Sequence, residues 1–143
     1  MLKVLEVQEA TEELYAVASN LMIQLTNNNE LTYQKFQEII DADTSVLLFL
    51  KINNCFIGMT TLTYYQTLSG IKGWIEDVIV DEKFRGKGYS VKLLEEAIVF
   101  ARNKGVEKLM LTSRPTRVAA NNLYRKIGFS QRETNVYIMD LNV

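Results

Sequence analysis

The chain has 143 residues, with 16 Lys and Arg against 17 Asp and Glu, no His, one Cys and one Pro. We expect a single domain over residues 1–143, because a chain of this length buries roughly 68–70% of its unfolded surface and needs no metal or disulfide to fold. The missing histidines exclude Ser-His-Asp and Cys-His nucleophile systems and zinc sites with imidazole ligands. The net charge of -1 argues against non-specific nucleic-acid binding, which depends on bulk electrostatic attraction.

Residues 1–25 alternate charged and apolar positions without a continuous apolar stretch. We therefore expect neither a signal peptide nor a membrane span, and we expect a reduced, cytoplasmic setting for the protein.

The first part of the chain predicts one strand and two helices. Leu2–Val7 is a strand candidate, and Thr11 is the candidate N-cap of a first helix. The polar run 26–30 ends that helix, and Thr32 starts a second one. The apolar positions recur at helical spacing in both segments: Leu14, Val17, Leu21 and Leu25 in the first, and Tyr33, Phe36 and Ile40 in the second.

Three consecutive strands follow. Val46–Ile52 and Phe56–Tyr65 are apolar, β-prone runs, separated by two asparagines that tolerate the left-handed conformations of a tight hairpin turn. Glycines at 70 and 73 bracket the next predicted turn, and Trp74–Val80 is the third strand.

The last part of the chain alternates helices and strands. A polar loop, 81–88, precedes a helix that ends at Gly105 and buries Val91, Leu94, Ile98 and Ala101. Strand 109–112, a helix capped by Thr116 and ended by Gly128, and strand 136–141 follow. The order β-α-α-β-β-β-α-β-α-β predicts an α/β fold with one mixed sheet flanked by helices.

The loop between the strand 74–80 and the next helix has the features of an anion site. Backbone N–H groups at a helix N-terminus have no intrahelical partners, so a phosphate can bind them. Gly86 and Gly88 allow unusual dihedrals and close approach to the backbone, and Arg85 and Lys87 add mobile positive charge. The loop lacks the Gly-Lys-Ser/Thr of a Walker A motif and the third glycine of the dinucleotide fingerprint. A surface turn with a basic rim is the alternative.

The surrounding sequence resembles the GNAT superfamily of acetyl-CoA-dependent N-acetyltransferases. The resemblance rests on Arg85-x-x-Gly88-x-Ser90, on the strand before it, and on Ala119–Phe129 after it. Ser90 departs from the Gly or Ala of the family pattern. Residues 1–70 match only in the order of their elements.

The resemblance implies a binding site for acetyl-CoA and no metal. It implies that the backbone of 86–90 holds the pyrophosphate, and that the strand end pairs with the pantetheine arm. Arg117 occupies a position where many relatives have a cofactor-binding Asn, and Asn121 is a second candidate on the next helical turn. The implied cofactor-binding residues are Val78, Ile79, Val80, Arg85, Gly86, Lys87, Gly88, Tyr89, Ser90, Arg117 and Asn121.

Two catalytic residues are expected: Tyr124, which the resemblance implies, and Glu76, a carboxylate in a largely apolar strand, where a charge needs a partner or a function. The Tyr124 hydroxyl would protonate the departing thiolate, the alternative being a ring that only packs against the sheet. Glu76 would remove the proton of the acceptor ammonium, directly or through water. Alternation along a strand predicts that Glu76 and Asp77 point to opposite faces, with Asp77 a structural carboxylate. Cys55, without a histidine to activate it, is expected to be a buried or half-buried thiol rather than a nucleophile.

The expected activity is acetyl transfer from acetyl-CoA to a primary amine by direct attack in a ternary complex. A catalytically silent acyl-CoA-binding regulator is the alternative. The predicted partner is a small-molecule or peptide amine, and we expect the protein to bind neither nucleic acid nor a membrane. The sequence leaves the identity of the acceptor and the oligomeric state open. Members of the family that it resembles often form homodimers through their last strands, so a homodimer is possible.

Overall fold

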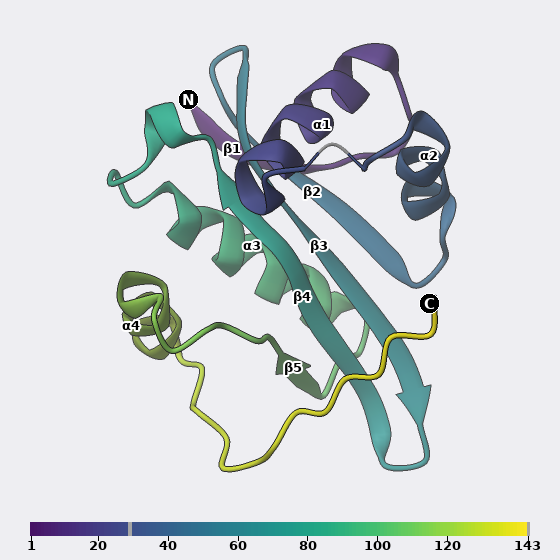
Figure 1. The fold of residues 1–143 in the computed structure, drawn as a ribbon, viewed down its shortest axis with the longest axis vertical. Coiled ribbons are helices and arrows are strands. Elements are labelled where there is room, and N and C mark those ends of the chain that lie inside the picture. The colour runs from purple at the N-terminus through teal and green to yellow at the C-terminus, as the bar shows by residue number, and fades with distance from the viewer. Residues whose placement is uncertain (29, 143) are drawn as a thin grey trace. The chain divides into compact units, whose positions relative to one another are not determined.

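A computed structural model describes residues 1–28 and 30–142 (Figure 1). The chain divides into two compact units, Met1–Thr112 and Ser113–Val143, and each is described here by itself. No helix of the described residues is long and apolar enough to cross a membrane.

The described residues of the first unit form a five-stranded sheet in the order β1-β2-β3-β4-β5. Neighbours from β1 to β4 are antiparallel, and β5 pairs with β4 in parallel. This confirms the predicted mixed sheet and the predicted order of elements through the last helix. The strands are β1 (Leu2–Glu6), β2 (Ser45–Ile52), β3 (Cys55–Thr67), β4 (Gly70–Val80) and β5 (Lys108–Met110).

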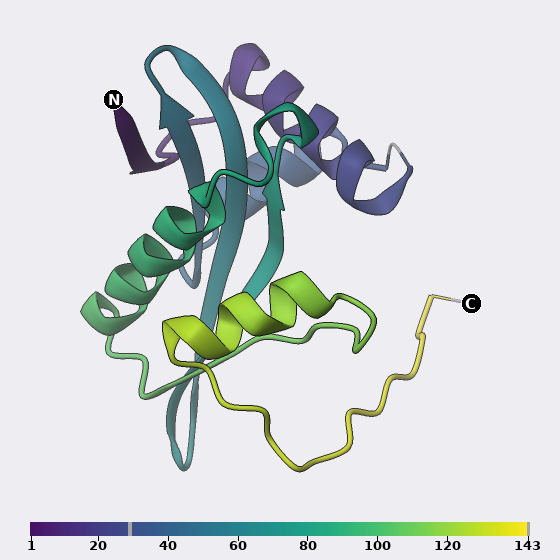
Figure 2. The same cartoon turned by 90° about the vertical axis from the view of Figure 1, so that its left-hand side faces the viewer.

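Three helices cover this sheet. Helices α1 (Glu12–Thr26) and α2 (Tyr33–Asp41) lie on one face, and α3 (Tyr89–Asn103) lies on the other (Figures 1 and 2). The predicted N-cap of α1 is confirmed, since the Thr11 hydroxyl accepts the Leu14 N–H at 3.2 Å. Thr32, predicted to start the second helix, is the N-cap of α2, and its hydroxyl accepts the Lys35 N–H at 3.1 Å. The core between α1, α2 and the sheet includes Ala18, Leu21, Phe36, Leu47, Phe49, Met59 and Ile79.

One of the two predicted turns between strands lies where the sequence places it, and the other is shorter than predicted. Asn53 has a φ of 53° in the β2–β3 hairpin, as its left-handed tolerance predicts. Gly73 lies inside β4 and not in a turn, so β4 begins at Gly70. A Cβ on Gly73 would lie 3.1 Å from a Val106 methyl, so glycine here permits close packing within the strand.

The second unit contains α4 (Val118–Ile127), which ends at Gly128 with a φ of 128°. Two sequence predictions fail here. Thr116 is not the N-cap, because the helix begins after Arg117 and no side chain caps it. Residues 136–141 form no strand, and none of the described residues of this unit does. An apolar, β-prone run makes a segment compatible with a sheet, but a neighbouring backbone must supply the hydrogen bonds.

Candidate active site

Strand β4 contains a β-bulge at its two acidic residues. Thr61 pairs with Glu76 and Met59 pairs with Ile79, so Asp77 and Val78 together face the single residue between Met59 and Thr61. Asp77 has a φ of 52°, in the left-handed region that few residues other than Gly, Asn and Asp adopt. Such bulges change the direction of side chains and are frequent beside active sites.

The bulge overturns the expectation that Glu76 and Asp77 point to opposite faces. Residues paired across two strands share a face of the sheet, so Glu76 lies on the face of Thr61, and Ile79 lies on the face of Met59. Both carboxylates line one pocket together with those partners. A regular strand of period two brings only one of two successive side chains to a given face, and the extra residue removes this restriction.

A buried hydroxyl holds the bulge in place. Thr60 is 1% exposed, and its Oγ1 donates to the backbone oxygen of Glu76 at 2.8 Å. This bond satisfies a carbonyl at the point where the regular ladder between β3 and β4 is interrupted.

We predict that Thr60→Val lowers the free energy of unfolding by about 1–3 kcal/mol, because the partly buried carbonyl of Glu76 loses its side-chain donor. Urea denaturation measures the change. Thr60→Ser, which keeps the hydroxyl, is the control and should keep the bulge and the pH dependence of activity. Equal stability of the valine variant and the parent would contradict the role given to this hydrogen bond.

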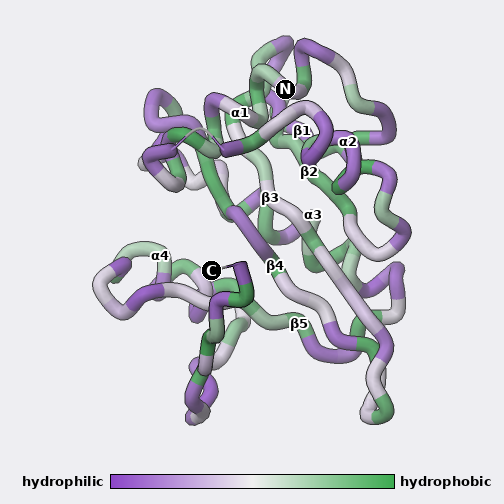
Figure 3. The backbone as a smooth tube through the Cα atoms, turned by 45° about the vertical axis from the view of Figure 1, so that its right-hand side comes forward, coloured by the Kyte–Doolittle hydropathy of each residue, from purple (hydrophilic) through white to green (hydrophobic). Residues whose placement is uncertain are grey.

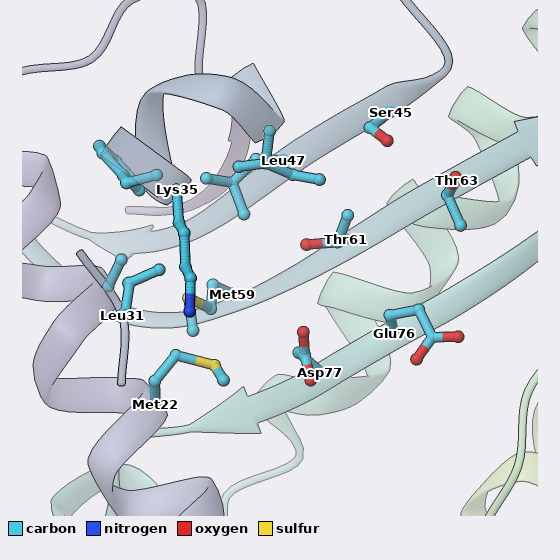
Figure 4. A pocket seen from close by; sticks show the side chains of 13 residues that line it. Met22, Leu31, Lys35, Ser45, Leu47, Met59, Thr61, Thr63, Glu76 and Asp77 are labelled. Atoms are coloured by element: carbon cyan, nitrogen blue, oxygen red, sulfur yellow. The ribbon is translucent and has the colours of Figure 1, made fainter. Parts of the chain in front are cut away.

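The bulge borders a pocket of about 320 Å³ between the sheet and the two helices α1 and α2 (Figure 4). Its polar groups come from β2, β3 and β4, and from Lys35 of α2. Figure 4 shows Asp77 on the side of Met22 and Thr61, and Glu76 on the side of Thr63. The rest of the lining is apolar: Ala18, Met22, Leu31, Phe36, Ile39, Leu47 and Met59.

The electrostatics of the pocket favour proton uptake. Partial burial raises the pKa of Glu76, and the neighbouring charge of Asp77 raises it further. Burial also raises the pKa of Asp77. A carboxylate whose pKa is raised is a stronger base than an ordinary one, so this pair suits the removal of a proton from an ammonium group.

The end of β4 has a free backbone edge. Pairing of β4 with β5 ends at Trp74 and Met110, whereas β4 continues to Val80. The Asp81 N–H donates to the Ile57 oxygen of β3, so by alternation the backbone groups of Val80 and Val78 face away from β3. Towards this end β4 becomes hydrophobic in Figure 3, and its unpaired edge can accept an extended ligand as a further strand.

The glycine loop follows directly after this edge. Gly86 and Gly88 have φ values of 79° and 78°, and a Cβ on either would meet nothing within 4 Å. Gly88 is the N-cap of α3, and no side chain caps this end of the helix. Tyr89 and Ser90 form its half-buried first residues. The loop therefore presents open space in front of uncapped helix N–H groups, which fits a pyrophosphate.

Arg85 and Lys87 of the loop are less free than the sequence suggests. Arg85 Nε donates to the Val80 oxygen at 2.8 Å, so this side chain closes the loop onto the strand end. Lys87 Nζ lies 6.0 Å from the centre of the Phe84 ring, within reach of a cation–π contact. The expected mobile charge is thus partly replaced by a structural role, because the turn needs a donor for the last carbonyl of β4.

The second unit holds the other predicted site residues. Tyr124 lies on α4, with its ring centre 6.3 Å from that of Phe129. Burial raises the pKa of the Tyr124 phenol, and the Arg117 guanidinium partly opposes this shift. The Asn121 amide nitrogen donates to the backbone oxygens of Arg114 and Arg117, both at 2.9 Å. It therefore holds the start of α4, and its nitrogen is not a free cofactor donor.

Other features of the site were not predicted from the sequence. The bulge, the anchoring role of Thr60 and the place of Lys35 in the pocket all depend on pairing between distant segments. A charged pair within an apolar strand was the only signal of the bulge. Cys55 is exposed, contrary to expectation, because it is the first residue of β3 after the hairpin turn.

Comparisons with known proteins show which family and which fold this chain resembles. A profile of the Acetyltransferase (GNAT) family matches residues 9–129. Uncharacterized N-acetyltransferase YobR from Bacillus subtilis (strain 168) is 36% identical over 110 residues, which are 76% of this chain and 43% of that protein. The chain thus spans less than half the length of this curated relative.

Solved structures share the fold at low identity. A putative acetyltransferase from Agrobacterium tumefaciens str. C58 is 22% identical, with a TM-score of 0.83 and coverage of 98% of this chain and 99% of that one. Glucosamine-6-phosphate N-acetyltransferase from Arabidopsis thaliana is 23% identical, with a TM-score of 0.80 and coverage of 97% and 98%. Since the family profile matches most of the sequence, this chain belongs to the Acetyltransferase (GNAT) family.

Proposed function

We propose that this chain is a single catalytic domain that transfers an acetyl group from acetyl-CoA to a primary amine by direct attack. The observation that carries the proposal is the arrangement along β4. Its bulge presents two carboxylates to a pocket, and its free edge leads from there to an uncapped, glycine-lined helix N-terminus. One strand thus joins a site for a base to a site for a phosphate.

The residues of the first unit fit acetyl-CoA. The backbone N–H groups of 86–90 would bind the pyrophosphate, since the two glycines leave the space in front of them open. The backbone groups of Val78 and the N–H of Val80, whose oxygen accepts from Arg85, would pair with the amides of the pantetheine arm, with Ile79 holding the strand in the core. When bound, acetyl-CoA supplies an activated thioester carbonyl.

The reacting amine must be neutral before its nitrogen can attack. Glu76 takes the proton of the acceptor ammonium, directly or through water, and its raised pKa fits this role. The Val78 N–H donates to the developing oxyanion. The nitrogen–carbon bond would form, the carbon–sulfur bond would break, and the Tyr124 hydroxyl would donate its proton to the departing sulfur. The second proton that the nitrogen loses as the amide forms would return the Tyr124 phenolate to its neutral form, and the proton on Glu76 would pass to solvent. A raised phenol pKa keeps this proton available at neutral pH.

The pH dependence of turnover tests the proposal. Glu76 acts as a base only when ionised, so activity should fall as the pH falls through its raised pKa. We expect Glu76→Gln to lower turnover by about 10²-fold, to abolish this acidic limb, and to leave coenzyme A affinity unchanged. Thiol release with saturating acetyl-CoA and a panel of primary amines measures both effects.

Asp77→Asn is the matched control, because Asn also tolerates a positive φ. Removing the Asp77 charge lowers the pKa of Glu76, so this variant should keep the acidic limb but shift it to lower pH. Loss of the limb in Asp77→Asn and not in Glu76→Gln would assign the base to Asp77. Coenzyme A binding without thiol release for any amine would instead favour a silent acyl-CoA-binding protein.

A further inference from the structure

The pocket beside the bulge has charges of opposite sign on opposite walls. Glu76 and Asp77 lie on β4, and Lys35 reaches into the pocket from α2 (Figure 4). Among residues 1–28 and 30–142, the structure records an ion pair for Lys92 and Glu96 but none for these three groups. Within this described part of the chain, Lys35 Nζ makes one hydrogen bond, a long one of 3.5 Å to the Glu30 backbone oxygen. The cation therefore keeps donors that a ligand can use.

Apolar groups fill the space between the charged walls. Met22 and Leu31 flank the end of Lys35 in Figure 4, and Met59 lies beside it on β3. The hydroxyl groups of Ser45, Thr61 and Thr63 add polar partners along β2 and β3, whereas the surface around Lys35 is apolar and favours an apolar group of a ligand. A volume of about 320 Å³ lies at the lower end of small-molecule pockets. The pocket therefore suits a small aliphatic or aromatic body.

The wall that carries Lys35 is held in place before any ligand binds. The Tyr15 hydroxyl donates to the Leu31 oxygen at 2.8 Å, and the Tyr33 hydroxyl donates to the Ala10 oxygen at 3.2 Å. The rings of Tyr15 and Tyr33 meet edge to face at 5.5 Å. These contacts tie the start of α2 to α1, so a ligand need not order this segment, and less free energy is lost on binding.

We infer that the acceptor is a small amine with an apolar body and an anionic group: the amine meets Glu76 and Asp77, and the anion meets Lys35. This inference rests on the proposed function, since it assigns the substrate class of the same site. It disfavours polyamines, whose second ammonium group would face Lys35.

Three amines of equal chain length separate the alternatives: ω-aminohexanoate, hexylamine and hexamethylenediamine. For the parent, we expect kcat/KM for aminohexanoate to exceed that for the diamine about fivefold, because an exposed ion pair such as that between Lys35 and the carboxylate changes affinity by about this factor. In Lys35→Glu the ratio should fall below one. Lys3→Glu, an exposed lysine of β1 outside the pocket, is the control and should keep the parental ratio.

Binding keeps this test separate from that of the proposed function. Calorimetry of the three amines with the coenzyme A complex should give the same order of affinities and the same reversal in Lys35→Glu. If no amine is acetylated, the proposed function fails, and the binding order alone decides the inference. Equal binding of aminohexanoate and the diamine, or an order that Lys35→Glu does not change, overturns the inference whether or not acetylation occurs.

Discussion

Replacing Gly88 with valine is expected to abolish the stabilisation of the protein by coenzyme A. A valine Cβ would enter the open space in front of the α3 N-terminus, where the pyrophosphate is proposed to bind. A ligand at 100 times its dissociation constant raises the free energy of unfolding by about 2.7 kcal/mol, and this gain should disappear. Thermal unfolding with and without coenzyme A measures it.

The backbone strain of this variant needs a matched control, which the same helix provides. Gly105 follows the other end of α3 with a φ of 79°, close to the 78° of Gly88. A branched residue at either position pays a left-handed cost of about 1–2 kcal/mol. Gly105→Val should therefore melt earlier than the parent but keep the full shift with coenzyme A. A parental shift in Gly88→Val would show that the pyrophosphate binds elsewhere.

Tyr124→Phe is expected to lower turnover by about 10²–10⁴-fold while coenzyme A affinity and fold stay unchanged. Phenylalanine keeps the ring and its packing against Phe129, so the substitution removes only the hydroxyl. A thiolate with a pKa of about 8.5 is already a fair leaving group, which places the effect near the lower end of this range. With a slow acceptor amine, departure of the thiolate limits the rate to a greater extent. Single-turnover kinetics with such an amine should therefore show the effect of the substitution.

Tyr137→Phe is the control, since Tyr137 lies in the same unit with an exposed side chain. It should keep parental turnover. If Tyr124→Phe also keeps it with a slow acceptor, the hydroxyl takes no part in the reaction, and Tyr124 is a packing residue of α4.

Local signals in the sequence were sufficient for most of the elements. Thr11 and Thr32 cap helices, and the asparagines at 53 and 54 form a hairpin turn, because each acts through hydrogen bonds or dihedrals within a few residues of itself. The conformation of the glycine loop was also predictable from local sequence. Positive φ values at Gly86 and Gly88 follow from the one residue type that adopts them freely.

The sequence alone also determined the family, through the spacing of Arg85, Gly88 and the segment 119–129, and the family profile confirms it. It misjudged features that need a partner from elsewhere in the chain. Residues 136–141 are an apolar, β-prone run but have no strand beside them in their unit, and Thr116 precedes α4 without capping it.

Only the tertiary structure decided the form of the pocket. Alternation separates Glu76 from Asp77, whereas the register of β4 on β3 inserts an extra residue opposite Thr60 and brings both carboxylates to one face. Lys35 reaches that face only because α2 packs there on the sheet. Pairing register and helix packing depend on contacts between residues far apart in the chain, and those contacts have no counterpart in local sequence periodicity.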